Sequence, residues 1–73
     1  MEIQYEYARI ADALAREIEA GKIPPGGRLG NERELADLHG VSAGTIRRAV
    51  QELRDRGLVA TLPGKGTYVL PQD

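Results

Sequence analysis

The sequence predicts a mostly α-helical domain with a small β-hairpin, on three observations. Residues 31–57 contain two amphipathic stretches separated by a short turn at Gly40. A third amphipathic stretch precedes them at residues 5–21, and after Gly57 two short apolar runs flank a Gly-rich tip. Apolar residues at spacings of three and four indicate helices, whereas short runs rich in Val, Thr and Tyr between Gly and Pro indicate strands. We therefore expect three helices followed by a two-stranded hairpin.

The first helix of the central pair is expected to begin at Asn31 and to end at Gly40. The Asn31 side chain can accept a hydrogen bond from a free backbone N–H group, and Glu34 completes a capping box. Gly40 lacks a Cβ atom and can adopt the left-handed conformation that ends a helix. The apolar side of this helix is predicted to consist of Leu35, Ala36 and Leu38.

The second helix of the pair is expected to start at Ser42, another capping residue, and to run to Gly57. Only about three residues separate the two helices, which is too few for an antiparallel arrangement, so they should cross steeply as in a helix-turn-helix. A purely structural helical hairpin is the alternative. The apolar stripe of the second helix is predicted to be Ile46, Ala49, Val50 and Leu53.

The segment at residues 5–21 supplies the third helix of the core. Its polar side mixes acidic and basic residues, so we expect it to pack on the other helices rather than lie on a membrane surface. Gly21 and the Pro/Gly run at residues 24–27 end it, and Arg28 and Leu29 then form an extended segment able to pair as a small strand. The apolar stripe of this helix is predicted to be Tyr7, Ile10, Ala11, Leu14 and Ile18.

The C-terminal segment is expected to form strands at residues 58–62 and 67–70 around the tip Pro63-Gly64-Lys65-Gly66. A lone hairpin is marginally stable in water, so its apolar side should pack on the helices. Helices followed by a hairpin with a basic, flexible tip form a winged helix-turn-helix, here three helices plus a two-stranded wing. This fold favours DNA binding over the structural alternative.

Composition excludes several kinds of function. The 73 residues allow one small domain with a modest core, and there is no Cys and a single His, so we expect no disulfide, no metal site and no cofactor. Residues 64–67 lack the spacing and the following helix of a nucleotide phosphate-binding loop. We expect no enzyme activity. Two acidic pairs, whose members point to different sides of a helix, look solvated rather than catalytic: Glu17/Glu19 and Glu32/Glu34.

Charge is distributed unevenly along the chain. The net charge of −1 argues against indiscriminate nucleic-acid binding. Residues 1–37 carry five basic and eight acidic residues, whereas residues 38–73 carry five basic and three acidic residues. No acidic residue occurs from Leu38 to Gln51 or from Gly57 to Gln72, so the two acid-free stretches coincide with the start of the second paired helix and with the hairpin.

The sequence also lacks a long apolar run and a signal-type start. We therefore expect a soluble protein with no membrane contact. Its expected place is the cytoplasm, associated with the nucleoid.

The whole chain resembles the N-terminal winged helix-turn-helix domain of the GntR family of bacterial transcriptional regulators. IADALAREIEAGKIPPGGRL resembles the first helix and loop, NERELADLHGVS the second helix, TIRRAVQELRDRGLV the recognition helix and PGKGTYV the wing tip. The resemblance implies a sequence-specific regulator, such as a repressor, whose dimer binds an inverted-repeat operator in double-stranded DNA. The recognition helix, residues 42–56, should lie in the major groove, and the wing, residues 63–67, near the minor groove.

Family members continue through a linker into a larger C-terminal domain that binds a small-molecule effector and dimerises. The resemblance therefore implies that residues 1–73 form the DNA-binding domain, with that effector-binding and dimerisation domain absent. A fragment and a small stand-alone protein both remain open. Either would have to form a homodimer on the DNA, so we expect low affinity for each single domain.

The resemblance also assigns DNA contacts by matched position. The chain departs from the family pattern at Ala43 and Gly44, where relatives often carry polar residues; Ala43 can touch a thymine methyl group and Gly44 allows close backbone approach. Gly44 costs helix stability of about 1 kcal/mol relative to Ala. The matched positions are Arg33, Ser42, Thr45, Arg47, Gly64, Lys65 and Gly66.

Helical periodicity projects the outward face of the recognition helix independently of the family. Arg48 should point directly outward, and Arg47 should lie at the flank near Thr45. We expect Arg47 to read a base, because Arg pairs well with guanine, and Arg48 to read a base or hold a phosphate. The alternatives are ion pairs one helical turn on, Arg48 with Glu52 and Arg33 with Asp37. For the domain as a whole, the alternative is a winged-helix module that binds another protein.

Overall fold

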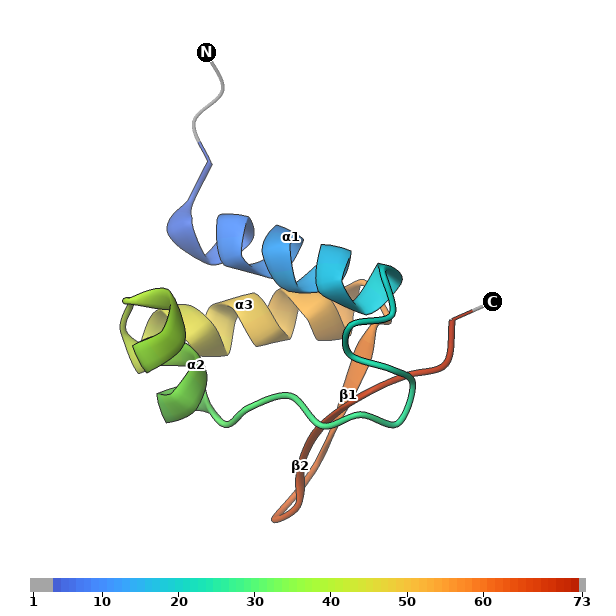
Figure 1. Cartoon of the computed structure of the whole chain (residues 1–73). Coiled ribbons are helices and arrows are strands. Elements are labelled where there is room, and N and C mark those ends of the chain that lie inside the picture. Colours follow the sequence, from blue (N-terminus) through green and yellow to red (C-terminus); the bar gives the residue numbers. More distant parts are fainter. Residues whose placement is uncertain (1–3, 73) are drawn as a thin grey trace.

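The computed structural model describes residues 4–72 and shows three helices and one antiparallel hairpin. In chain order these are α1 (Glu6–Glu19), α2 (Glu32–His39), α3 (Ala43–Asp55), β1 (Val59–Leu62) and β2 (Gly66–Val69). Helices α1 and α3 lie side by side, α2 lies across the beginning of α3, and the hairpin projects away from α1 (Figure 1). The predicted fold class, three helices plus a two-stranded wing, is confirmed.

The ends of α2 and α3 follow the predicted capping residues. The backbone N–H of Glu34 donates to Asn31 Oδ1 at 2.8 Å, and the N–H of Asn31 donates to Glu34 Oε1 at 2.9 Å, which completes the capping box. Gly40 ends α2 in the left-handed region, with φ of +67°. Ser42 caps α3 by accepting from the N–H of Thr45 at 3.1 Å. Residues 40–42 form the predicted short turn.

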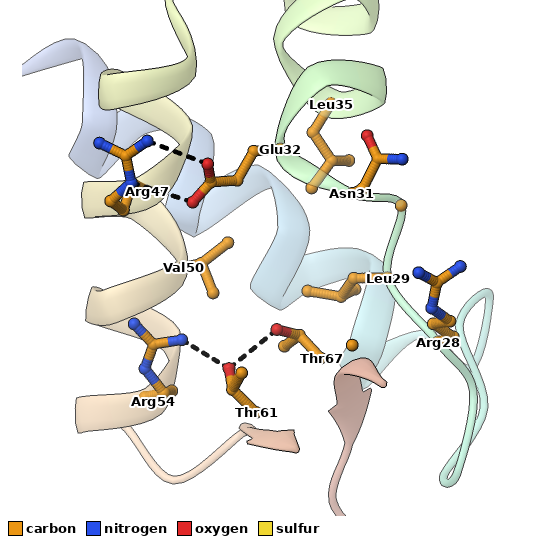
Figure 2. Close-up of a pocket in the computed structure, with 12 residues that line it drawn as sticks. Arg28, Leu29, Asn31, Glu32, Leu35, Arg47, Val50, Arg54, Thr61 and Thr67 are labelled. Carbon is orange, nitrogen blue, oxygen red and sulfur yellow. Dashed lines mark hydrogen bonds and ion pairs between the residues drawn. The ribbon is translucent and has the colours of Figure 1, made fainter. Parts of the chain in front are cut away.

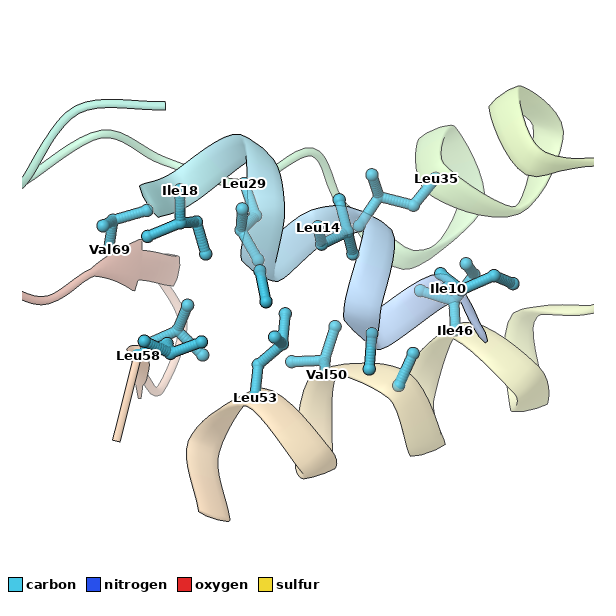
Figure 3. Packing of buried hydrophobic residues seen from close by; sticks show 14 of the residues in the cluster. Ile10, Leu14, Ile18, Leu29, Leu35, Ile46, Val50, Leu53, Leu58 and Val69 are labelled. Carbon is cyan, nitrogen blue, oxygen red and sulfur yellow. The ribbon is translucent and has the colours of Figure 1, made fainter. Parts of the chain in front are cut away.

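The core lies between α1 and α3 and is closed by α2 and the base of the hairpin (Figure 3). Ile10, Ile46 and Leu53 are its largest fully buried side chains. Ile46 fills the junction of the helix-turn-helix, where Ala36 is also buried. The predicted apolar stripes of α1 and α3 are confirmed, with Tyr7 only partly buried at the margin. The remaining buried members are Ala11, Leu14, Ala15, Ile18, Leu29, Leu35, Ala49, Val50, Leu58, Val59 and Val69.

Leu38 is an error in the predicted apolar side of α2. Its side chain is 77% exposed, whereas Leu35 and Ala36 are buried. Helix α2 has only eight residues and lies at one end of the molecule (Figure 1), where it contacts α3 and buries only Leu35 and Ala36. Leu38 falls outside that contact, so the apolar spacing alone was not enough to bury it.

The hairpin pairs with a third segment at its base. Val59 lies opposite Val69 and Leu62 opposite Gly66 in the antiparallel register. The N–H of Leu29 donates to the carbonyl of Thr67 at 2.9 Å, and the N–H of Val69 donates to the carbonyl of Gly27 at 2.8 Å. This confirms the short extended pairing segment expected at residues 28–29 and fixes the wing relative to the loop before α2. Within residues 4–72, no helix has the length and apolar character needed to span a membrane.

Candidate nucleic-acid interface

The N-terminal turn of α3 is exposed and offers hydrogen-bonding groups. Helix geometry leaves the backbone N–H groups of Ala43 and Gly44 without an intrahelical acceptor. The hydroxyls of Ser42 and Thr45 lie 3.0 Å apart, so they hold each other at the edge of this turn. A Cβ atom on Gly44 would meet only the Ser42 Oγ, at 3.8 Å, so packing does not require glycine there. This turn suits an anion or a closely approaching ligand, because N–H groups and the positive end of the helix dipole meet there.

Arg47, predicted to read a base, is held by a residue that sequence reasoning did not select. Its Nε donates to Glu32 Oε2 and its Nη2 to Glu32 Oε1, both at 3.0 Å (Figure 2). The hydrogen bonds from Arg47 to Glu32 raise the pKa of the guanidinium. The acidic pair Glu32/Glu34 was expected to be solvated, but Glu32 instead binds Arg47. A guanidinium has five donor hydrogens, so three remain for a ligand.

Arg48 lies on a different side of α3 from Arg47. Its guanidinium carbon is 4.3 Å from the centre of the Tyr7 ring, a cation–π contact that directs the side chain toward α1. Glu52 accepts a hydrogen bond at 2.9 Å from Arg56, not from Arg48. The alternative pairings of Arg48 with Glu52 and of Arg33 with Asp37 are wrong: the ion pairs found in residues 4–72 are others. Arg33 is exposed in the first turn of α2, beside Glu32.

The wing tip forms a second basic position, separated from the start of α3. Lys65 is exposed between Gly64, whose φ is +74°, and Gly66, whose φ is +134°. Its backbone N–H donates to the carbonyl of Leu62, and its carbonyl accepts from the Tyr68 hydroxyl. The tip is thus a closed, hydrogen-bonded turn with the lysine side chain free to extend. Of the predicted site residues, residues 42–47 lie together in the first turns of α3, Arg33 lies in the first turn of α2, and residues 64–66 lie apart from both at the tip of the wing (Figure 1).

A concave surface between α2, α3 and the wing encloses a space of about 220 Å³ (Figure 2). Leu29, Leu35 and Val50 contribute apolar side chains to it. Arg28 and Arg54, neither of which sequence reasoning selected, line it together with Arg47. Arg54 follows Arg47 by seven residues, two helical turns, and this spacing was the available sequence signal. No such signal marks Arg28, because the pairing of its segment with the wing brings it there.

These elements define a class of protein. Here α2 and α3 form a capped helix-turn-helix, and a hairpin with a cationic tip follows them. A domain built in this way is a winged helix-turn-helix domain. The model of the gntR family of bacterial regulatory proteins matches residues 6–69. The chain belongs to this family.

Known relatives carry the same domain. The HTH-type transcriptional regulator SmoD of Agrobacterium fabrum is 40% identical over 63 residues, which are 86% of this chain and 27% of SmoD. A histidine utilization repressor of Pseudomonas aeruginosa is also 40% identical over 63 residues, which are 86% of this chain and 25% of that protein. The chain thus spans about a quarter of the length of these two relatives, one named as a transcriptional regulator and the other as a repressor.

Among solved structures, AraR(DBD) in complex with operator ORE1 superposes with a TM-score of 0.87 and 36% identity, over 92% of this chain and 82% of that one. A structure of the NTD of AraR in complex with mutant ORR3 has a TM-score of 0.89 and 35% identity, over 94% of this chain and 99% of that one. Family and structural neighbours therefore agree on a regulator domain.

Proposed function

We propose that this domain binds double-stranded DNA sequence-specifically, as the DNA-binding unit of a GntR-type transcriptional regulator. One observation carries the proposal: the fold matches AraR(DBD) in complex with operator ORE1 over 92% of the chain. The features that such binding needs are exposed here, namely the N-terminal turn of α3 and the cationic wing tip. In this proposal α3 enters the major groove and residues 63–67 lie near the minor groove. Residues 1–73 would then act as one DNA-binding unit, without catalysis.

The proposed contacts divide into reading and positioning groups. Arg47 reads a base edge with the donors that Glu32 leaves free. Ser42, Thr45 and Arg33 hold phosphates, helped by the free N–H groups at the start of α3. Ala43 and Gly44 allow the helix to approach the bases closely, and Arg48 contacts DNA at the margin nearest α1. Lys65, between Gly64 and Gly66, extends toward the minor groove.

A regulator of this kind acts on the chromosome, so its proposed location is the cytoplasm, at the nucleoid. We propose that two copies occupy the two halves of an inverted repeat, because a single small domain makes too few contacts for high affinity. Effector binding would belong to the part of a regulator that the matching relatives have in addition to this domain.

The test is a selection of binding sequences from a pool of random duplex DNA at two salt concentrations. Enrichment of a short inverted repeat, with affinity that falls as salt rises, is the expected result. No enriched sequence and no salt-sensitive binding at high protein concentration would favour the protein-interaction module instead.

Two variants then separate the proposed roles. Arg47→Ala should relax preference at one base pair and cost about 1–3 kcal/mol of discrimination. Lys65→Ala should weaken binding to all sequences alike and reduce the slope of log affinity against log salt by about 1. Arg16→Ala, an exposed change on α1, is the control and should do neither. A uniform loss for both Arg47→Ala and Lys65→Ala would refute the base-reading role of Arg47.

A further inference from the structure

Two arginines of the concave surface have no acidic partner. Glu32 is the one carboxylate among the residues that line this surface, and both of its oxygens accept from Arg47. Arg54 donates only to neutral groups, at 2.6 Å to the Thr61 hydroxyl and at 2.8 Å to the Gln51 side-chain oxygen. Arg28 makes no side-chain hydrogen bond or ion pair with any residue of the described range 4–72. The residues that line the surface therefore carry a formal charge of +2, from three arginines and one glutamate.

Both arginine side chains lie against the wing, and the Arg54 guanidinium is held there by a hydrogen bond. Thr61, which accepts from Arg54, is itself 2.8 Å from the Thr67 hydroxyl on the opposite strand (Figure 2). Arg28 lies across Gly66: a Cβ atom built on this glycine would be 2.6 Å from the Arg28 Nε. Because hydrogen bonds already restrict the Arg54 side chain, little further conformational entropy is lost when it binds a ligand.

We propose that Arg28 and Arg54 bind the DNA backbone where one strand passes from the major groove at α3 to the minor groove at the wing, each arginine neutralising a phosphate. This rests on the proposed function, which places α3 and the wing in neighbouring grooves. The residues fit a sugar–phosphate strand. Two guanidinium forks suit phosphate oxygens, and one hydroxyl of the Thr61–Thr67 pair can also donate, since the other donates within the pair. The concave space measures about 220 Å³, which leaves room for a partly hydrated phosphate.

The salt dependence of binding measures these contacts directly. Each phosphate contact contributes about 0.9 to the slope of log affinity against log salt. Loss of one contact should therefore weaken binding about 15-fold at 50 mM salt but only about 4-fold at 200 mM salt. The loss should be equal for a selected operator and for unrelated duplex, because phosphates carry no sequence information.

The experiment titrates fluorescent duplex DNA, both the selected operator and an unrelated sequence, with wild type, Arg28→Gln and Arg54→Gln across this salt range. Arg16→Gln on the exposed side of α1 is matched in charge change and should keep the wild-type slope. Arg28→Lys and Arg54→Lys retain a positive charge and should recover most of the slope. Circular dichroism and urea unfolding establish that each variant is folded; Arg28→Gln decides the question should Arg54→Gln loosen the wing.

The outcomes distinguish failure of this backbone contact from failure of the proposed DNA-binding function. Wild-type protein that does not bind either duplex refutes the proposed function. Wild-type binding with a normal salt slope, unchanged in Arg28→Gln and Arg54→Gln, refutes the backbone contact and leaves DNA binding intact.

A free phosphate ion is the other ligand that these two arginines could bind by the same chemistry. If inorganic phosphate at ionic strength matched with chloride raises the Tm of wild type but not of Arg28→Gln, while DNA salt slopes stay equal, the site binds a free phosphate group and the backbone assignment is wrong.

Discussion

Replacing Glu32 by Gln tests whether this carboxylate prepares Arg47 for base reading. The two hydrogen bonds of the pair are both 3.0 Å long, but the side chains of Arg47 and Glu32 are 65% and 47% exposed. Water screens such a pair, so its contribution to stability is small. Glu32 also lies in the first turn of α2, where a negative charge adds about 0.3–1 kcal/mol. Glu32→Gln should therefore destabilise the domain by about 0.3–1 kcal/mol, mainly through the lost charge at the start of α2, and each kcal/mol lowers the Tm by about 4–8 °C.

The same change should have two opposite effects on DNA binding. Arg47 loses the partner that fixes its side chain, so its contribution to base discrimination, about 1–3 kcal/mol for a bidentate contact, falls. Removal of one negative charge beside the DNA raises affinity for any sequence. The ratio of operator to unrelated-duplex affinity should therefore drop at least about fivefold, which corresponds to 1 kcal/mol.

Urea unfolding and fluorescence anisotropy against both duplexes measure these two effects in one set of variants. Asp37→Asn, an exposed change of the same charge on the same helix, is the matched control and should preserve the affinity ratio. An unchanged ratio in Glu32→Gln, with stability reduced as expected, would show that Arg47 does not depend on Glu32 for its role. An equal drop in Asp37→Asn would show that charge alone explains the effect.

The remaining predictions concern stability. Ile46→Ala removes a fully buried side chain and should cost about 2–5 kcal/mol in urea unfolding, against about 4–11 kcal/mol for a whole domain of this length, whereas Leu38→Ala, at an exposed position, should change stability by less than about 0.5 kcal/mol. A hydrogen bond from Arg56 holds the pKa of Asp12 below its usual value of 3.8, so the stabilisation is complete above that pH and is lost as pH falls through the lowered pKa. Asp12→Asn should accordingly be less stable than wild type at pH 7, and the two unfolding curves should converge below pH 3.8.

Most of the fold could be predicted from the sequence because its determinants are local. Asn31 and Glu34 stand three residues apart and cap α2 by themselves, and Gly40 ends it without help from distant parts of the chain. The stripe of α3 that begins at Ile46 is a property of helical spacing alone. Leu38 satisfied the same spacing and is exposed, because burial depends on whether a second element covers that position. Periodicity states which side of a helix is apolar but not how far its neighbours extend.

The partners of charged side chains could not be predicted in this way. Glu32 and Arg47 are separated by 15 positions, and Arg56 and Asp12 by 44, so neither pair follows from a helical repeat. The local pairs that spacing did suggest for Arg48 and Arg33 do not form. An exposed ion pair is worth only about 0.2–1 kcal/mol, so a long flexible side chain can form any of several pairs of similar energy. The sequence could nominate candidate site residues such as Arg47, whereas the contacts that orient their side chains could not be predicted.

The net charge of the chain does not predict the charge of the concave surface between α2, α3 and the wing, because acidic and basic residues lie on different parts of the molecule. The chain carries −1 overall, yet Asp12 and Glu52 both bind Arg56, at the end of α3 farthest from the α2–α3 turn. Arg28 and Arg54 keep unneutralised charge on the side that faces the proposed DNA. The molecule measures 34 × 27 × 20 Å, whereas electrostatic screening in 0.1 M salt acts over about 10 Å. A DNA strand at the wing therefore experiences the nearby arginines and little of the acidic residues on α1, and an acidic protein can present a cationic surface to nucleic acid.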